Sequence, residues 1–137
     1  MPQKILVVED EFIISLELQY RLQELGFEII SNIASGEEAI SLVREVHPDL
    51  ILMDINLSGD FDGIETANII HSFSTIPIIF ITANSNSDIL NKIKTIPLCT
   101  YLLKPFSDME LKRNLRKFLA MSKNLTDAAQ TKSAVTC

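Results

Sequence analysis

Five short apolar runs alternate along this chain with segments of helical periodicity, and that alternation constrains the fold more than any other feature. The runs are rich in Ile, Leu and Val, which is typical of strands buried on both faces. Strands that alternate with helices form a parallel sheet with helices on both faces and right-handed crossovers. We therefore expect one doubly wound α/β domain over residues 1–121. Its five strands are expected at residues 4–8, 27–33, 49–53, 76–81 and 98–103.

The helices between these strands are indicated by apolar spacing and by residues typical of helix ends. Gly26 is expected as the C-cap of the first helix, because glycine adopts the left-handed conformation at low cost. Ser35 with Glu38, and Ser107 with Glu110, have the spacing of capping boxes that open later helices. The expected helices cover residues 12–25, 36–46, 63–72, a short stretch around 89–93, and 107–121.

Length and composition limit the class of protein. A chain of 137 residues fits one domain and can bury about two-thirds of its unfolded surface. With 47% hydrophobic and 22% charged residues it is not a disordered chain, although residues 122–137 lack periodicity and are predicted to be a disordered tail. The apolar runs are too short to span a bilayer, and no signal peptide precedes the first run. We expect a cytoplasmic protein that does not bind membranes.

The charge of the chain indicates which partners to expect. A net charge of −6 argues against direct binding of nucleic acid, which requires Lys and Arg to neutralise phosphates. Basic residues do gather on the last expected helix, where we interpret them as a solvated face that favours the helix C-terminus. A docking face for an acidic partner is the alternative. These basic residues are Lys112, Arg113, Arg116, Lys117 and Lys123.

Polar residues follow four of the five apolar runs. Glu9 and Asp10 follow the first run, Asp54 the third, Thr82 the fourth and Lys104 the fifth. The carboxyl ends of parallel strands open onto one crevice, so these side chains are expected to converge there. Three carboxylates, a hydroxyl and an ammonium group suit a divalent cation and a phosphoryl group better than an organic cofactor.

The chemistry of such a crevice follows from its residue types. Asp10 and Asp54 are hard oxygen ligands of the kind that Mg²⁺ prefers, and Glu9 can act through a bound water. A carboxylate in the mouth of the crevice can be the nucleophile that carries an aspartyl phosphate, and the central strand makes Asp54 our choice. Lys104 and Thr82, with nearby backbone amides, would stabilise the oxygens of the phosphoryl group.

These residues carry a resemblance to a known family. Five segments occur in order at the ends of the expected strands: Val8-Glu9-Asp10, Asp49 to Asp54, Asp62-Gly63, Ile81-Thr82-Ala83 and Tyr101 to Phe106. Over roughly residues 4–120 the chain resembles the receiver domain of two-component response regulators, in particular chemotaxis-regulator-like stand-alone receivers. The resemblance implies a flavodoxin-like (βα)5 fold with strand order 2-1-3-4-5. It also implies that Asp54 accepts a phosphoryl group from a histidine kinase or a phosphotransfer protein.

The resemblance further assigns roles around the metal. Asp10 and Asp54 would bind Mg²⁺ (or Mn²⁺) directly, Asn56 would add its backbone carbonyl, and Glu9 would act through water. Lys104 would pair with the phosphoryl group.

On the other side of the crevice, the resemblance assigns a switch. Thr82 and Tyr101 would form the switch pair, in which the hydroxyl moves to the phosphoryl oxygen and the ring turns inward. Ala83 is small and would leave the phosphoryl group accessible, and Pro105 would follow a cis peptide bond. The output would be a changed surface around the fourth and fifth strands and the helix between them.

Two asparagines are expected to tune the lifetime of the phosphorylated state. Asn56 and Asn84 lie two residues after Asp54 and Thr82, and they flank the route of an attacking water. The loop from Asn56 to Gly63 is one residue longer than is usual in the family, and this is the one departure of the chain from the family pattern.

Two other classes of protein were weighed. A small Mg²⁺-dependent aspartyl-phosphate hydrolase would need an Asp as general acid two residues after the nucleophile, where this chain has Asn56. A flavin module would need a loop that cradles phosphate after the first strand, and Glu9-Asp10-Glu11 would repel one. We therefore predict a receiver that catalyses only its own phosphorylation and dephosphorylation. It would act through a protein target, as a monomer or a phosphorylation-dependent dimer.

Overall fold

The computed structural model describes residues 3–121, which form one five-stranded parallel sheet with the order β2-β1-β3-β4-β5. This confirms the predicted 2-1-3-4-5 order. The predicted tail, residues 122–137, and Lys123 within it lie outside the described residues. The strands are β1 (Lys4–Val8), β2 (Glu28–Ile33), β3 (Leu50–Asp54), β4 (Ile78–Thr82) and β5 (Cys99–Leu103).

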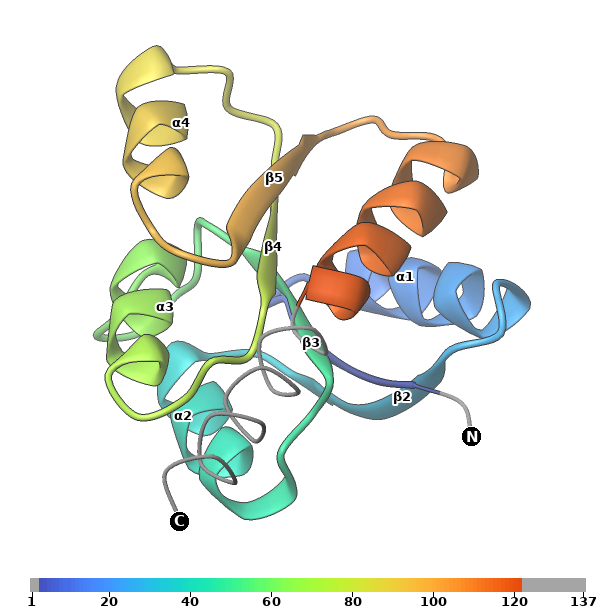
Figure 1. The fold of residues 1–137 in the computed structure, drawn as a ribbon, viewed down its shortest axis with the longest axis horizontal. Coiled ribbons are helices and arrows are strands. Elements are labelled where there is room, and N and C mark those ends of the chain that lie inside the picture. The colour runs from blue at the N-terminus through green and yellow to red at the C-terminus, as the bar shows by residue number, and fades with distance from the viewer. Residues whose placement is uncertain (1–2, 122–137) are drawn as a thin grey trace, which may run out of the picture.

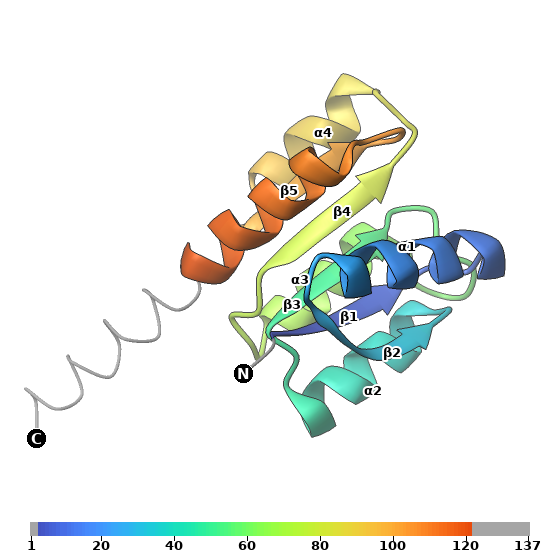
Figure 2. The same ribbon diagram turned by 90° about the vertical axis from the view of Figure 1, so that its right-hand side faces the viewer.

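Helices cover both faces of the sheet, so the flavodoxin-like doubly wound fold is confirmed. Figures 1 and 2 show α1 and the C-terminal helix on one face, and α2, α3 and α4 on the other. Each face has its own hydrophobic cluster between sheet and helices. The helices are α1 (Phe12–Glu24), α2 (Gly36–Val46), α3 (Gly63–His71), α4 (Ser87–Lys94) and a C-terminal helix over residues 108–121.

The central strands explain why the polar residues gather at one edge. All five residues of β3 and all five of β4 are buried. Successive side chains of β3 point to opposite faces, with Leu52 in the cluster under α1 and Met53 in the cluster under α2 and α3. Burying one such side chain stabilises the fold by about 1.5 to 3 kcal/mol. Charged groups are therefore confined to the strand ends.

Local hydrogen bonds set the helix starts, and they correct one expectation. Ser35 caps α2 and accepts from the N–H of Glu38 at 3.2 Å, but the Glu38 carboxylate contacts the Ser35 hydroxyl, so the predicted reciprocal box is incomplete. A full capping box opens α3 instead. There the Asp62 carboxylate accepts from the N–H of Glu65 at 2.8 Å, and the Glu65 carboxylate accepts from the N–H of Asp62 at 3.4 Å.

Element boundaries differ from the expectations by one or two residues. Leu25 is the C-cap of α1, and Gly26 follows it with φ +94°, so the glycine lies one position beyond the cap that was predicted. Asp54 is the last residue of β3 and not the first of the loop. Its backbone is therefore held by the pairing of β3 with β4. In the described residues, no helix combines the length and apolar character needed to cross a membrane.

Candidate functional site

Three carboxylates converge at the carboxyl edge of the sheet. Glu9 and Asp10 directly follow β1, and Asp54 ends the neighbouring strand β3. One carboxylate oxygen of each lies within 4.8 Å of the others. Residues that are 44 positions or more apart in sequence thus meet because adjacent parallel strands end side by side. The cluster consists entirely of oxygen donors.

Glu9 is the most constrained member of this cluster. Its side chain is buried, and Oε1 accepts a hydrogen bond from the N–H of Glu11 at 3.1 Å, whereas Oε2 has no hydrogen-bond partner. Burial is the main cause that raises the pKa of Glu9 from 4.5 to about 7, and the negative charge of Asp54 adds to it. The N–H of Glu11 and the ammonium of Lys104 lower this pKa but do not offset the burial. The single ammonium group of Lys104 therefore does not compensate for the burial of this carboxylate.

The loop after β3 folds back over the carboxylates. Oδ1 of Asp54 accepts from the N–H of Asn56 at 3.1 Å, and Oδ2 of Asp10 accepts from the N–H of Ser58 at 3.3 Å. Asp54 is only 8% exposed, so little of its surface reaches solvent. Asn56 thus lies beside the cluster, and its own side chain is exposed.

Glu37 holds the same loop from the opposite side, and the sequence did not indicate this contact. Oε1 of Glu37, in the first turn of α2, accepts from the N–H groups of Asp60 at 3.0 Å and Phe61 at 3.2 Å. Gly59 precedes these amides with φ +105°, a conformation that glycine adopts readily. The pKa of Glu37 is lowered by its own backbone N–H and by those of Asp60 and Phe61. Glu37 lies 23 and 24 positions before the two amides, so no local pattern in the sequence indicates this contact.

Lys104 reaches the cluster from β5. Its Nζ lies 3.7 Å from Oε2 of Glu9, and its backbone N–H donates to the carbonyl of Thr82 at 2.8 Å. The Lys104–Pro105 peptide bond is cis. The ammonium group thus approaches the carboxylates across the ends of β4 and β5.

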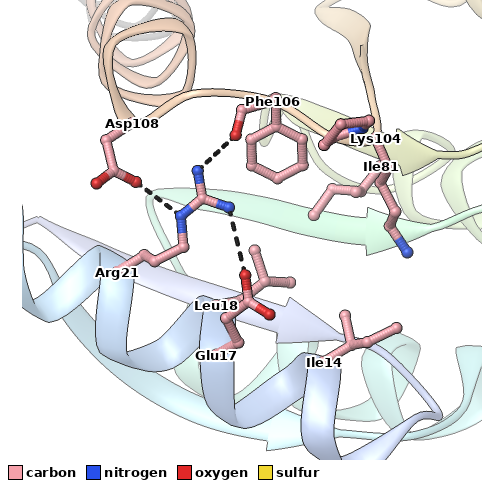
Figure 3. Close-up of a pocket in the computed structure, with 9 residues that line it drawn as sticks. Ile14, Glu17, Leu18, Arg21, Ile81, Lys104, Phe106 and Asp108 are labelled. Atoms are coloured by element: carbon pink, nitrogen blue, oxygen red, sulfur yellow. Dashed lines mark hydrogen bonds and ion pairs between the residues drawn. The ribbon is translucent and has the colours of Figure 1, made fainter.

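Arg21 ties the segment after Lys104 to α1, and sequence reasoning missed this residue as well. Its guanidinium donates to the carbonyl of Phe106 and to Oδ1 of Asp108, both at 2.7 Å, and it lies 4.6 Å from the centre of the Phe106 ring. Figure 3 shows these contacts at one end of a cavity of about 640 Å³ between α1 and this segment. The contacts join residues 85 and 87 positions apart, and no local pattern in the sequence indicates them.

The hydroxyl side of the crevice is held by short-range bonds. Oγ1 of the buried Thr82 accepts from the N–H of Asn84 at 2.9 Å, and Ala83 and Asn84 are exposed. Tyr101 is half-buried and pairs in register with Phe80, two residues before Thr82. Both Phe80 and Tyr101 pack on the face that α2, α3 and α4 cover. The ring of Tyr101 therefore lies on the face next to α4.

A parallel sheet of this order, with carboxylates, a hydroxyl and an ammonium group at one edge, defines a receiver-type α/β protein. The chain matches the model of the response regulator receiver domain over residues 5–116. The chain belongs to this family, and it is a receiver domain of two-component signalling. The comparisons thus support this function over the aspartyl-phosphate hydrolase.

Curated relatives of the chain include regulators from bacteria and algae. It is 36% identical over 111 residues to the transcriptional regulatory protein PdtaR of Mycobacterium tuberculosis, covering 81% of this chain and 54% of that protein. It is 37% identical over 119 residues to the probable transcriptional regulator ycf27 of Porphyridium aerugineum, covering 85% and 48%. The chain spans about half the length of the curated relatives it matches.

Solved receiver structures share the fold. The signal receiver domain of a modulated diguanylate cyclase from Desulfovibrio desulfuricans G20 has a TM-score of 0.82 at 31% identity, covering 90% of this chain and 98% of that one. The receiver domain of the sensor histidine kinase PA1611 from Pseudomonas aeruginosa PAO1 has a TM-score of 0.78 at 29% identity, covering 88% and 99%. The latter holds a magnesium ion coordinated in its active site cleft.

Proposed function

We propose that Asp54 is the phosphoacceptor of this receiver and that the phosphodonor is a histidine kinase or a phosphotransfer protein. The observation that carries the proposal is the acidic cluster of Glu9, Asp10 and Asp54. Its negative charge is not balanced by nearby positive charge, and Oε2 of Glu9 is buried without a hydrogen-bond partner. Asp54 is the member at the end of the central strand β3. A cytoplasmic location and a protein target belong to the same proposal.

The residues of this cluster fit a divalent cation of the Mg²⁺ or Mn²⁺ type. The donors are all oxygens, and the unpartnered oxygen of Glu9 is the kind of atom that a cation or its water would satisfy. Asp10 and Asp54 would hold the ion through their carboxylates, Asn56 through its backbone carbonyl, and Glu9 through a water. The ion, when bound, neutralises charge on the phosphoryl oxygens.

In the transfer step, the carboxylate of Asp54 supplies the electron pair of the new oxygen–phosphorus bond. The nitrogen–phosphorus bond of the donor's phosphohistidine breaks, and its electron pair returns to the ring nitrogen. The ammonium of Lys104, the hydroxyl of Thr82 and the N–H of Ala83 bind the phosphoryl oxygens. The transfer involves no cofactor besides the ion, and the chain catalyses only its own phosphorylation and dephosphorylation.

The same step supplies a switch. In the resting protein the Thr82 hydroxyl accepts from the N–H of Asn84 at 2.9 Å, and movement toward a phosphoryl oxygen breaks this bond. Tyr101 then turns into the space that is released, which changes the surface formed by β4, α4 and β5. A target protein or a second copy of the chain binds to that changed surface. Asn56 and Asn84 tune how long the state lasts.

The test is intact-mass measurement after incubation with acetyl phosphate, with and without Mg²⁺. We expect one phosphoryl group on the native chain that requires Mg²⁺, is cleaved by alkali and by hydroxylamine as an acyl phosphate is, and is absent from Asp54→Asn. Asp60→Asn is the matched control, because Asp60 is an exposed carboxylate of the same loop whose side chain is not assigned a role. No adduct, or an adduct that survives Asp54→Asn, would refute the assignment.

A further inference from the structure

Besides a local bond from the N–H of Asn56 to Oδ1 of Asp54, the loop between β3 and α3, residues 55–62, is held by side chains distant in sequence at two points that differ in kind. At one point Oδ2 of Asp10 accepts from the N–H of Ser58 at 3.3 Å. At the other, Oε1 of Glu37 accepts from the N–H groups of Asp60 and Phe61 at 3.0 and 3.2 Å. Asp10 belongs to the acidic cluster, whereas Glu37 lies on α2 and is not part of it.

This difference matters when the cluster holds a cation. The Asp10 carboxylate must then serve the ion, and its contact with Ser58 competes with that role. Glu37 is outside the acidic cluster, so its contacts with the loop do not compete with a bound ion. Its carboxylate accepts from the N–H groups of Asp60 and Phe61. The Glu37 contacts therefore remain to restrain the loop in both states.

We propose that Glu37 is a positioning residue for the bound cation. By holding the amides of Asp60 and Phe61, it keeps the loop closed over the cluster, with the Asn56 carbonyl directed to the ion. The inference rests on the proposed function, because it assumes that the cluster binds Mg²⁺ and that Asn56 contributes a ligand.

The chemistry of the contact supports this role. Two N–H donors share one carboxylate oxygen, and hydrogen bonds to an ionised acceptor are stronger than neutral ones. Gly59, at φ +105°, turns the chain so that the next two amides point in one direction, as in an anion-binding concavity of backbone N–H groups. The N-terminal turn of α2 also favours a negative charge at Glu37.

The loop has little else to hold it in this region. Ser58, Gly59 and Asp60 are exposed, while Ile55 and Leu57 near the start of the loop are buried. Segments with few buried contacts open readily unless hydrogen bonds restrain them. Glu37 supplies this restraint for the exposed stretch.

The experiment compares Glu37→Ala and Glu37→Gln with Glu38→Ala. Glu38 is the matched control, because it lies in the same first turn of α2, carries the same charge and does not contact the loop. Three quantities are measured on each protein by NMR and calorimetry: Mg²⁺ affinity from a titration followed at backbone amides, water exchange at the amides of Asp60 and Phe61, and the melting temperature.

We expect Glu37→Ala to raise the Kd for Mg²⁺ by about 3-fold to 10-fold, below the roughly 10-fold to 100-fold typical of groups that orient a metal ligand directly. Exchange at the two amides should accelerate in the same variant. Glu37→Gln retains an acceptor oxygen and should recover part of both losses. Glu38→Ala should match the native chain in affinity and exchange.

Several results would overturn the inference. If the native chain binds Mg²⁺ and Glu37→Ala binds it equally well, the positioning role is wrong while the proposed function stands. An equal loss in Glu38→Ala would show that only the charge of the helix turn matters. Unchanged exchange at Asp60 and Phe61 would mean that Glu37 does not restrain the loop. A native chain that does not bind Mg²⁺ would refute both the inference and the proposed metal site.

Discussion

The two loops that flank Asp54 and Thr82 are held in opposite ways. The loop after β3 is restrained by side chains that are distant in sequence, with Glu37 reaching across 23 and 24 residues and Asp10 across 48. The loop after β4 holds itself through a chain of bonds that each span two residues. These run from Asn84 to Thr82, from Asn86 to Asn84 and from Asp88 to Asn86.

The difference separates two tasks at one edge of the sheet. A metal site requires ligands that stay in place before and after the ion arrives, and long-range restraints provide this. A switch requires a segment that can change its conformation locally at low energetic cost. Short-range hydrogen bonds can break one after another without disturbing the core. The loop after β3 suits the first task, and the loop after β4 suits the second.

The largest effect is expected where the loop after β3 joins α3. A Cβ at Gly63 would collide with the carbonyl oxygen of Asp54 and lie 2.8 Å from Cα of Ile55. Both are backbone atoms of the central strand's end, so they cannot move aside cheaply. We expect Gly63→Ala to lower the free energy of unfolding by about 3 kcal/mol, measured by urea denaturation.

Gly26→Ala is the control for this substitution. Unlike Gly63, Gly26 has a positive φ, but a Cβ there would meet nothing within 4 Å. Its cost should be about 1 kcal/mol, from backbone strain alone. Equal costs at the two glycines would show that the close approach to Asp54 does not constrain the site.

The next effect concerns the ionisation of Glu9 in the acidic cluster. In metal-free buffer, Glu9 loses its proton near pH 4.5 in the unfolded chain and near pH 7 in the folded one. The folded state therefore binds more protons between these values, and the free energy of unfolding falls as pH rises. The contribution of Glu9 is complete below pH 4.5 and is lost as pH passes about 7.

We expect this loss to be on the order of 1 to 3 kcal/mol in the native chain and to be absent from Glu9→Gln. Denaturation curves at a series of pH values, with a chelator present, measure it. Added Mg²⁺ should reduce the fall, because the cation favours the ionised form. Parallel pH profiles for the native chain and Glu9→Gln would contradict the assignment.

A smaller effect is expected from the self-held loop. Asn86 caps α4 by accepting from the N–H groups of Asp88 and Ile89. Asn86→Ala should lower stability by about 1 kcal/mol, and amide exchange should rise within α4 only. Asn91→Ala, an exposed change on the same helix, is the control. A loss of Mg²⁺ affinity in Asn86→Ala would show that the two loops are not separate.

The smallest effect is expected at the mouth of the crevice. Asn84 is exposed two residues after Thr82, and a bulky side chain there should hinder an attacking water. We expect Asn84→Phe to slow loss of the phosphoryl group about 3-fold, which corresponds to about 0.6 kcal/mol in the barrier. Ser85→Phe adds the same bulk one residue further on and should leave the decay rate near native. An unchanged rate of phosphoryl loss in Asn84→Phe would contradict the role of Asn84 in tuning the lifetime of the phosphorylated state.

Most of the fold was predictable because its signals are local. Apolar runs marked the strands, and apolar spacing marked the helices, with boundaries shifted by one or two residues. The Asp62–Glu65 capping box was missed although its spacing is visible in the sequence. Ser35 and Glu38 share that spacing without forming the reciprocal bonds, so spacing alone does not decide the geometry.

The convergence of Glu9, Asp10 and Asp54 was also predictable, for a topological reason. Parallel strands that are neighbours in a sheet must end at the same edge, so residues just beyond them meet whatever their separation in sequence. The contacts of Glu37 and Arg21 follow no such rule. Glu37 accepts from two backbone N–H groups, and Arg21 donates to one carbonyl and one carboxylate, all of them distant in sequence.

The sequence by itself thus determined the strands, their parallel arrangement and the set of polar groups at the carboxyl edge, because periodicity and strand ends are read residue by residue. The order of the strands came from the resemblance to the receiver family. The tertiary structure alone decided how the loop after β3 and the segment after Lys104 are held. Those restraints depend on the distance and direction between α2, α1 and two loops. Such distances exist only once the helices have packed on the sheet.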